Sequence, residues 1–160
     1  MRLWPLIIVE QLPRQQLLGQ HRECCALRGN GWGRKHSTVD YVFRHPYWWL
    51  CLYHSEIMFE MARRRYKYDE KWRVYCYRGK SVGYDYSEFT WMMGGLPSGM
   101  AKNGIGSLPI YPEHDEKYLK ECIENLKAKG VNIVSPALFS LRKIMFCDII
   151  PSSFSKEHNV

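Results

Sequence analysis

Long apolar runs are missing from this chain of 160 residues, although 46% of its residues are hydrophobic. A helix needs about 18 apolar residues to cross a bilayer. The early run Leu6–Val9 is far shorter, and Glu10 and Pro13 follow it closely. It is also too short for the core of a signal peptide. We therefore expect a protein that stays in the cytoplasm and has no membrane partner.

Regularly spaced cysteine pairs are missing too. The six cysteines show neither a disulfide framework nor the two Cys-x-x-Cys pairs of a zinc site; they are Cys24, Cys25, Cys51, Cys76, Cys122 and Cys147. We expect reduced core thiols and no metal. One alternative stays open, a metal site built from His21, Cys24 and Cys25 with Cys51 or His54. Adjacent cysteines make it a poor zinc signature.

Fingerprints of nucleotide binding and of serine hydrolases are also absent. The glycine-rich segment 28–36 matches neither the Walker nor the dinucleotide spacing, and no nucleophile-elbow motif supports Ser/His/Asp catalysis. We expect no cofactor. Instead, three glycines in this segment can expose backbone amides beside Arg28, Arg34 and Lys35. The segment predicts phosphate contacts, with a plain turn as the alternative.

Arginine is scarce in the second half. Beyond residue 80 only Arg142 occurs, whereas 11 arginines precede it. The net charge is +7, yet residues 1–80 hold 15 Lys and Arg against 7 Asp and Glu, and residues 81–160 hold 8 against 9. Guanidinium groups suit phosphate recognition, so this asymmetry predicts a nucleic-acid partner. A solvated charged face is the alternative.

Hydrophobic periodicity predicts a mainly helical protein. Apolar residues recur at helical spacing in four stretches, which are 13–25, 47–65, 112–129, and 135 to just before Pro151. His54 lies on the apolar stripe of the second stretch, so we interpret it as a packed core histidine.

Residues 81–111 contain six glycines and show no period, which predicts a long irregular loop. We expect a single compact helical domain over residues 1–150, followed by a polar tail over 151–160. We further expect the protein to be a monomer.

Two basic segments interrupt the helical pattern. Arg63-Arg64-Arg65 is either a solvated helix end or a phosphate clamp. Residues 72–80 alternate aromatic and basic side chains, which suits stacking on bases by Trp72 and phosphate contact by Lys80. An amphipathic edge strand would show the same alternation.

Glu23 follows Arg22 near the end of the first predicted helix. Helical spacing places its side chain on the same side as Gln16 and Gly19. Glycine inside a helix costs about 1 kcal/mol relative to alanine, and the missing side chain would let another segment or a ligand approach. We infer a steric need at Gly19, although chance is a rival explanation.

These features carry a resemblance to a known family. Residues 15–23, the triplet 34–36 and residues 60–68 resemble the pyrimidine-dimer DNA glycosylases, over roughly the first half of the chain. The resemblance implies that the N-terminal α-amine is the nucleophile and that Glu23 is the essential carboxylate. It also implies phosphate contacts by Arg2, Arg22 and Arg28.

The nucleophile implied by the resemblance is Met1, because the bulky Arg2 should keep the initiator methionine in place. An α-amine has an unperturbed pKa of about 7.7–8.0, so part of it is neutral near physiological pH. In the family the amine belongs to threonine, and the extension from residue 81 onward has no counterpart there. We expect the amine and Glu23 to form the catalytic pair.

The function implied is a DNA glycosylase with AP lyase activity on damaged duplex DNA, at pyrimidine dimers or abasic sites. The damaged nucleotide is extruded from the stack, the amine forms a Schiff base with C1′, and β-elimination nicks the strand. The alternative is a non-catalytic nucleic-acid-binding protein of the same fold. Loss of nicking with retained DNA affinity on Glu23→Gln would distinguish the enzyme from the binder.

Overall fold

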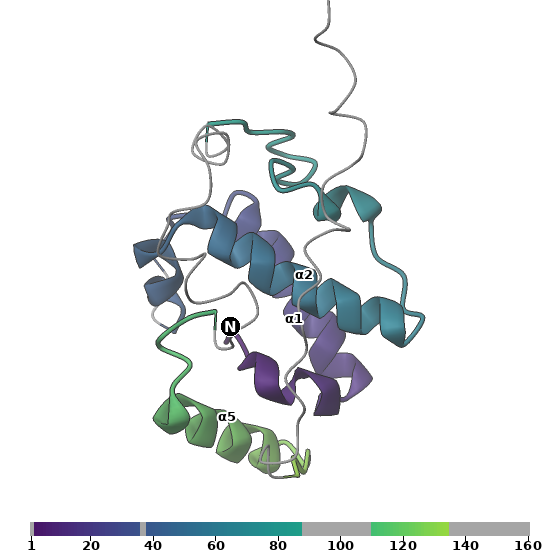
Figure 1. Ribbon diagram of the computed structural model, residues 1–160, viewed down its shortest axis with the longest axis vertical. Coiled ribbons are helices and arrows are strands. Elements are labelled where there is room, and N and C mark those ends of the chain that lie inside the picture. Colours follow the sequence, from purple (N-terminus) through teal and green to yellow (C-terminus); the bar gives the residue numbers. More distant parts are fainter. Residues whose placement is uncertain (1, 36–37, 88–109, 135–160) are drawn as a thin grey trace, which may run out of the picture.

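The structure, a computed structural model, describes residues 2–35, 38–87 and 110–134. In chain order these contain η1 (Leu6–Gln11), α1 (Arg14–Arg28), η2 (Asp40–Arg44), α2 (Tyr47–Arg63), η3 (Glu70–Arg73) and α5 (Glu116–Ala128) (Figure 1). The described ranges hold no strand, only an isolated antiparallel bridge between Tyr77 and Tyr84. The predicted mainly helical fold is confirmed. No described helix is long and apolar enough to cross a membrane.

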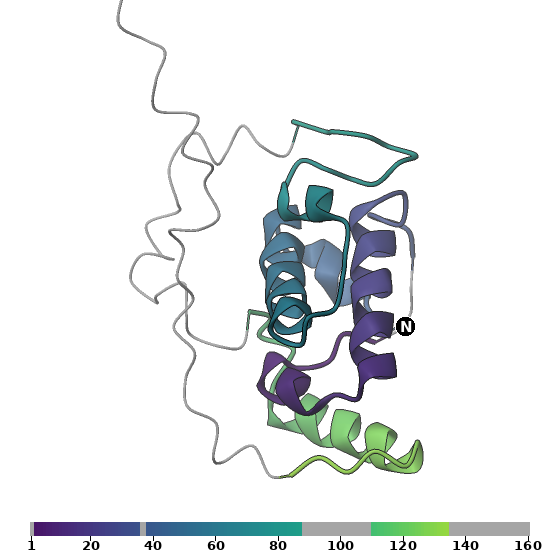
Figure 2. The same cartoon turned by 90° about the vertical axis from the view of Figure 1, so that its right-hand side faces the viewer.

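Helices α1 and α2 pack side by side and form the body of the molecule (Figure 2). A proline precedes each helix, with φ of −59° at Pro13 and −56° at Pro46, values that suit entry into a helix. Both helices were predicted. However, α1 continues past the expected end at Cys25 as far as Arg28, because the N–H of Gly29 still bonds to the Cys25 carbonyl at 3.0 Å.

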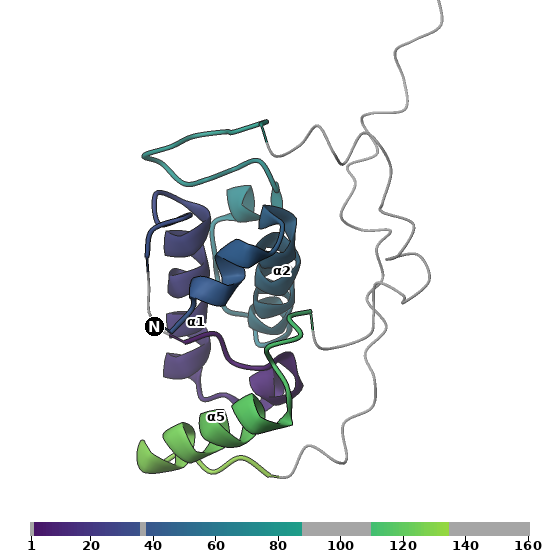
Figure 3. The same ribbon diagram turned by 90° about the vertical axis from the view of Figure 1, so that its left-hand side faces the viewer.

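Helix α5 lies across one end of this pair, and the segment from η3 to residue 87 covers the opposite end (Figure 3). The predicted start of α5 at Pro112 was wrong. The Asp115 side chain accepts the N–H of Tyr118 at 2.8 Å, and this N-cap begins the helix at Glu116. Gly130, with φ of 77°, follows the helix end as expected.

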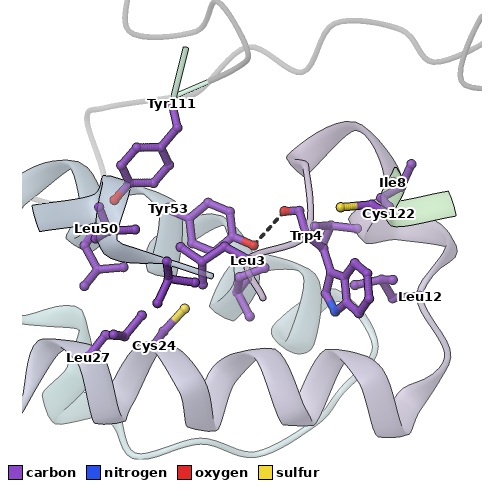
Figure 4. Close-up of a cluster of buried hydrophobic side chains, with 14 of the residues drawn as sticks. Leu3, Trp4, Ile8, Leu12, Cys24, Leu27, Leu50, Tyr53, Tyr111 and Cys122 are labelled. Atoms are coloured by element: carbon purple, nitrogen blue, oxygen red, sulfur yellow. Dashed lines mark hydrogen bonds between the residues drawn. The ribbon is translucent and has the colours of Figure 1, made fainter. Parts of the chain in front are cut away.

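The core lies where α1, α2 and α5 meet the first residues of the chain (Figure 4). Leu3 and Tyr53 are completely buried in it. It also includes Cys24 from α1, Leu50 from α2 and Cys122 from α5. All described cysteines are free thiols, as expected, while Cys147 lies outside the described residues.

Two arginines of the basic run at the end of α2 bind other groups of the protein. The Glu60 carboxylate accepts hydrogen bonds at 2.7 Å from Arg63 and at 2.6 Å from Arg64. Arg64 also donates to the carbonyls of Leu12 at 2.6 Å and Glu10 at 2.7 Å. Arg64 therefore belongs neither to a solvated helix end nor to a phosphate clamp, because its guanidinium joins α2 to the segment before α1.

Several predicted features lie outside the described residues. They are Met1, the helix expected from residue 135, the polar tail over 151–160 and most of the irregular loop, of which the structure describes only 81–87 and 110–111.

Candidate active site around Glu23

Three helices hold the backbone of the first residues. The N–H of Trp4 donates to Gln20 Oε1 of α1 at 2.8 Å. Its carbonyl accepts the Tyr53 hydroxyl of α2 at 2.7 Å (Figure 4). The Tyr118 hydroxyl of α5 donates to the carbonyl of Leu3 at 2.9 Å. The start of the chain is thus fixed against all three helices, which sets the direction in which it meets α1.

Glu23 lies where this segment meets α1. The backbone N–H of Arg2 donates to Glu23 Oε2 at 3.4 Å, and Gln20 Nε2 donates to the same oxygen at 3.2 Å. Because Gln20 Oε1 accepts from Trp4, the orientation of its amide group is determined by its two partners. Gln20 therefore holds both the chain start and the carboxylate, a role that we did not predict from the sequence.

Burial raises the pKa of the half-buried Glu23 carboxyl above its ordinary value, although the Arg2 N–H, the Lys129 ammonium and the Gln20 amide act in the opposite direction. A carboxyl whose pKa is raised by burial exchanges protons more readily near neutral pH. Such a group suits general acid–base chemistry.

The Glu23 pocket, with a volume of about 200 Å³, opens beside this carboxylate; it is lined by Arg2, Trp4, Gln16, Gly19, Gln20, Glu23, Asn125 and Lys129. Gln16, Gly19 and Glu23 share its α1 wall, as predicted. Apart from its chain neighbours and the backbone of its own helix, the nearest atom to a Cβ at Gly19 would be Arg22 Nη2, at 3.9 Å. Protein packing therefore does not require glycine there, and its effect is to keep the pocket open.

The sequence comparisons bear on the same part of the chain. Residues 1–74 match the pyrimidine dimer DNA glycosylase family. The matched segment includes Glu23 and the α1 wall of the pocket, and it ends before α5. The resemblance stated from the sequence is thus confirmed over this range. No curated protein and no solved structure shows a significant match to the chain.

Four of the expected DNA contacts are exposed at the surface: Arg22, Arg34, Lys35 and Lys80. Arg22 approaches the Glu23 pocket, because its Nη2 lies 3.9 Å from the position that a Cβ on Gly19 would take. Arg2 differs from these four. Its guanidinium is turned onto α5, 3.7 Å from Cys122 Sγ, 4.0 Å from Glu121 Oε2 and 5.5 Å from the centre of the Tyr118 ring.

Arg28 does not reach the surface, which corrects the phosphate contact that we expected of it. Its side chain is completely buried. It donates to the carbonyls of Trp72 at 2.7 Å, Val74 at 2.9 Å and Tyr77 at 3.3 Å. The guanidinium lies 5.1 Å from the Trp72 ring. Arg28 thus holds the segment after η3 in place, and base stacking by the partly exposed Trp72 stays a prediction.

The structure brings together part of the metal site that the sequence left open as an alternative. His21, Cys25 and His54 place their ligand atoms within 4.8 Å of one another, whereas Cys24 and Cys51 are not in this group. Arg28 Nη1 lies 3.1 Å from His54 Nδ1. Because arginine only donates, His54 Nδ1 must accept, and its Nε2–H then donates to His21 Nδ1 at 2.8 Å.

This hydrogen-bond chain disfavours a metal. A histidine that binds a metal through one ring nitrogen donates the N–H of its other ring nitrogen to an acceptor. In His54 the nitrogen left for this role, Nδ1, faces the Arg28 guanidinium, which can only donate. The carbonyls of Trp72 and Val74 hold that guanidinium in place. Burial also raises the pKa of the Cys25 thiol to about 12, so a thiolate ligand is unfavourable. The arrangement fits packed core side chains, as we expected of His54.

Proposed function

We propose that the protein removes damaged pyrimidines from duplex DNA and nicks the strand through a Schiff base on the α-amine of Met1, with Glu23 as the catalytic carboxylate. The observation that carries the proposal is the hydrogen bond of 3.4 Å from the Arg2 N–H to Glu23 Oε2 beside an open pocket. The family match over residues 1–74 supports the substrate class.

Covalent geometry supports the pairing of the two groups. Two consecutive backbone nitrogens are separated by at most about 3.6 Å. Because the Arg2 nitrogen lies 3.4 Å from Glu23 Oε2, an α-amine on the preceding residue falls within roughly 7 Å of that oxygen. This limit includes the separations at which the carboxylate can receive the amine's proton directly or through one water molecule.

The steps follow from this pairing. The neutral amine attacks C1′ of the extruded nucleotide, the C1′–N bond breaks, and the base leaves with the electron pair and takes a proton from water. Glu23 accepts the proton that the amine releases and passes it to O4′, which opens the sugar ring to a protonated Schiff base. Loss of a C2′ proton then expels the 3′ phosphate by β-elimination and nicks the strand.

Borohydride reduction in the presence of an abasic-site duplex tests this proposal. The wild-type protein should be joined covalently to the DNA, and peptide mass analysis should locate the bond at the α-amine of Met1. Glu23→Gln should lose nicking while keeping its affinity for DNA. Glu10→Gln, which alters a carboxylate outside the pocket, serves as the control. A bond to an internal lysine, or no bond at all, would contradict the proposal.

The same experiment tests the alternative. A non-catalytic nucleic-acid-binding protein would bind the duplex, give no covalent product, and bind equally well after Glu23→Gln.

A further inference from the structure

Part of the wall of the Glu23 pocket comes from α5 and its C-terminal end. Asn125 and Lys129 line the pocket together with Gly19 and Glu23, from which they are separated by more than a hundred residues along the chain. The family match ends at residue 74. A glycosylase pocket on α1 is therefore completed by a segment that the match does not include.

Lys129 is the pocket's accessible cation. Its ammonium lies 5.5 Å from the centre of the Trp4 ring, which holds the flexible side chain at the pocket through a cation–π contact. Lys129 is exposed, and none of the described carboxylates lies within salt-bridge distance of it. The other cation of the lining, Arg2, is engaged on α5 by Glu121 and Tyr118.

The volume and the charge of the Glu23 pocket indicate which group of the DNA Lys129 would contact. The pocket volume of about 200 Å³ leaves room for a sugar beside Glu23. The charged side chains of the lining are Glu23, Arg2 and Lys129, so cations outnumber carboxylates. A sugar beside Glu23 would leave its flanking phosphate at the rim, where Lys129 lies.

We propose that Lys129, assisted by the Asn125 amide, binds a backbone phosphate of the damaged strand at the rim of the Glu23 pocket. Helix α5 is thereby part of the DNA site. This inference rests on the proposed function, because the phosphate belongs to the strand whose sugar meets Glu23. It assigns to Lys129 a phosphate contact of the kind that the buried Arg28 cannot make.

The salt dependence of binding to an abasic-site duplex tests the inference. Each phosphate contact contributes about 0.9 to the slope of log K against log salt concentration. Lys129→Gln should weaken binding and reduce the slope by about 1, whereas Lys129→Arg should retain the wild-type slope. Lys117→Gln is the matched control, because Lys117 is an exposed lysine about 18 Å away along the same helix.

The outcomes separate this inference from the proposed function. If the wild-type protein forms the borohydride-trapped product and Lys129→Gln keeps the wild-type slope, the phosphate contact is refuted and the proposed function stands. A wild-type protein that gives no trapped product refutes both. A trapped product attached to Lys129 itself refutes the phosphate role, because that lysine would then be the nucleophile. Circular dichroism and thermal melts should show that the variants fold like the wild type.

Discussion

At the scale of the residue, the Glu23 carboxylate depends on its neighbours more than on its own position in α1. Burial raises its pKa, and the Arg2 N–H, Lys129 and Gln20 limit the rise. Gln20 is almost completely buried, so its two hydrogen bonds are shielded from water. A change at Gln20 should therefore alter the protonation of Glu23 directly.

Gln20→Glu should shift the pH profile of nicking. The variant keeps an oxygen acceptor for the Trp4 N–H but replaces the donor to Glu23 with a second carboxylate, and like charges raise each other's pKa. The acid limb of the profile reflects protonation of the catalytic carboxylate, so it should move to higher pH. Nicking rates measured across pH check this. Gln15→Glu adds the same charge at an exposed position on α1, and its profile should match the wild type.

The residue scale also shows what the sequence could predict. Helical spacing alone placed Gln16, Gly19 and Glu23 on one side, and the pocket confirms it. Arg28 was beyond prediction, because its partners are backbone carbonyls 44 to 49 positions away, and a carbonyl is the same in every residue. The position of Lys129 in the pocket could not be predicted for a related reason, since nothing in its local sequence indicates that α5 lies across α1.

At the scale of the element, arginines join segments whose sequences do not indicate that they lie together. Arg64 links the end of α2 to the carbonyls before α1, and Arg28 links α1 to the segment after η3. The periodic helices α1 and α2 were predictable because their apolar residues recur at helical spacing. Helix α5 begins four residues after the predicted Pro112, because the Asp115 side chain caps it at Glu116.

The Glu60 cluster should make the stability of α2 depend on pH. Burial alone would raise the Glu60 pKa, but hydrogen bonds and charge from Arg63 and Arg64 outweigh it and lower the pKa. A lowered folded-state pKa stabilises the protein above the unfolded value of about 4.3, and this stabilisation is lost as the pH falls through the folded value. Glu60→Gln should therefore reduce stability at pH 7 by roughly 2 kcal/mol.

Urea titrations at several pH values measure this contribution. The difference between wild type and Glu60→Gln should be largest near neutral pH. It should shrink as the pH falls below the unfolded value of about 4.3 and through the lowered folded-state pKa, below which Glu60 is protonated in both states. Glu70→Gln, which alters an exposed carboxylate paired with Arg73, should change stability little. A Glu60→Gln difference that stays constant with pH would show that the carboxylate charge is not responsible.

At the scale of the whole molecule, the family-matched segment is not a self-contained unit. Tyr111, Cys122 and Leu126 are completely buried in the same core as Leu3 and Tyr53, and they come from residues after the matched range. The Leu3 carbonyl is bound by Tyr118. Helix α5 therefore supports the chain start that carries the catalytic amine in our proposal.

A fragment of residues 1–87 should consequently fail to form the native core. Without α5 it leaves the apolar side of Leu3 and Ile8 uncovered, so we expect near-ultraviolet circular dichroism to be lost while helical signal persists, together with binding of a hydrophobic dye. Adding a peptide of residues 110–134 should restore the near-ultraviolet signal, whereas the same peptide with Leu126→Asp should not, because it would bury an unpaired charge. If the fragment alone unfolds cooperatively with the midpoint of the full chain, α5 is dispensable for the core, and the shared architecture argued from Tyr118 and Leu126 is wrong.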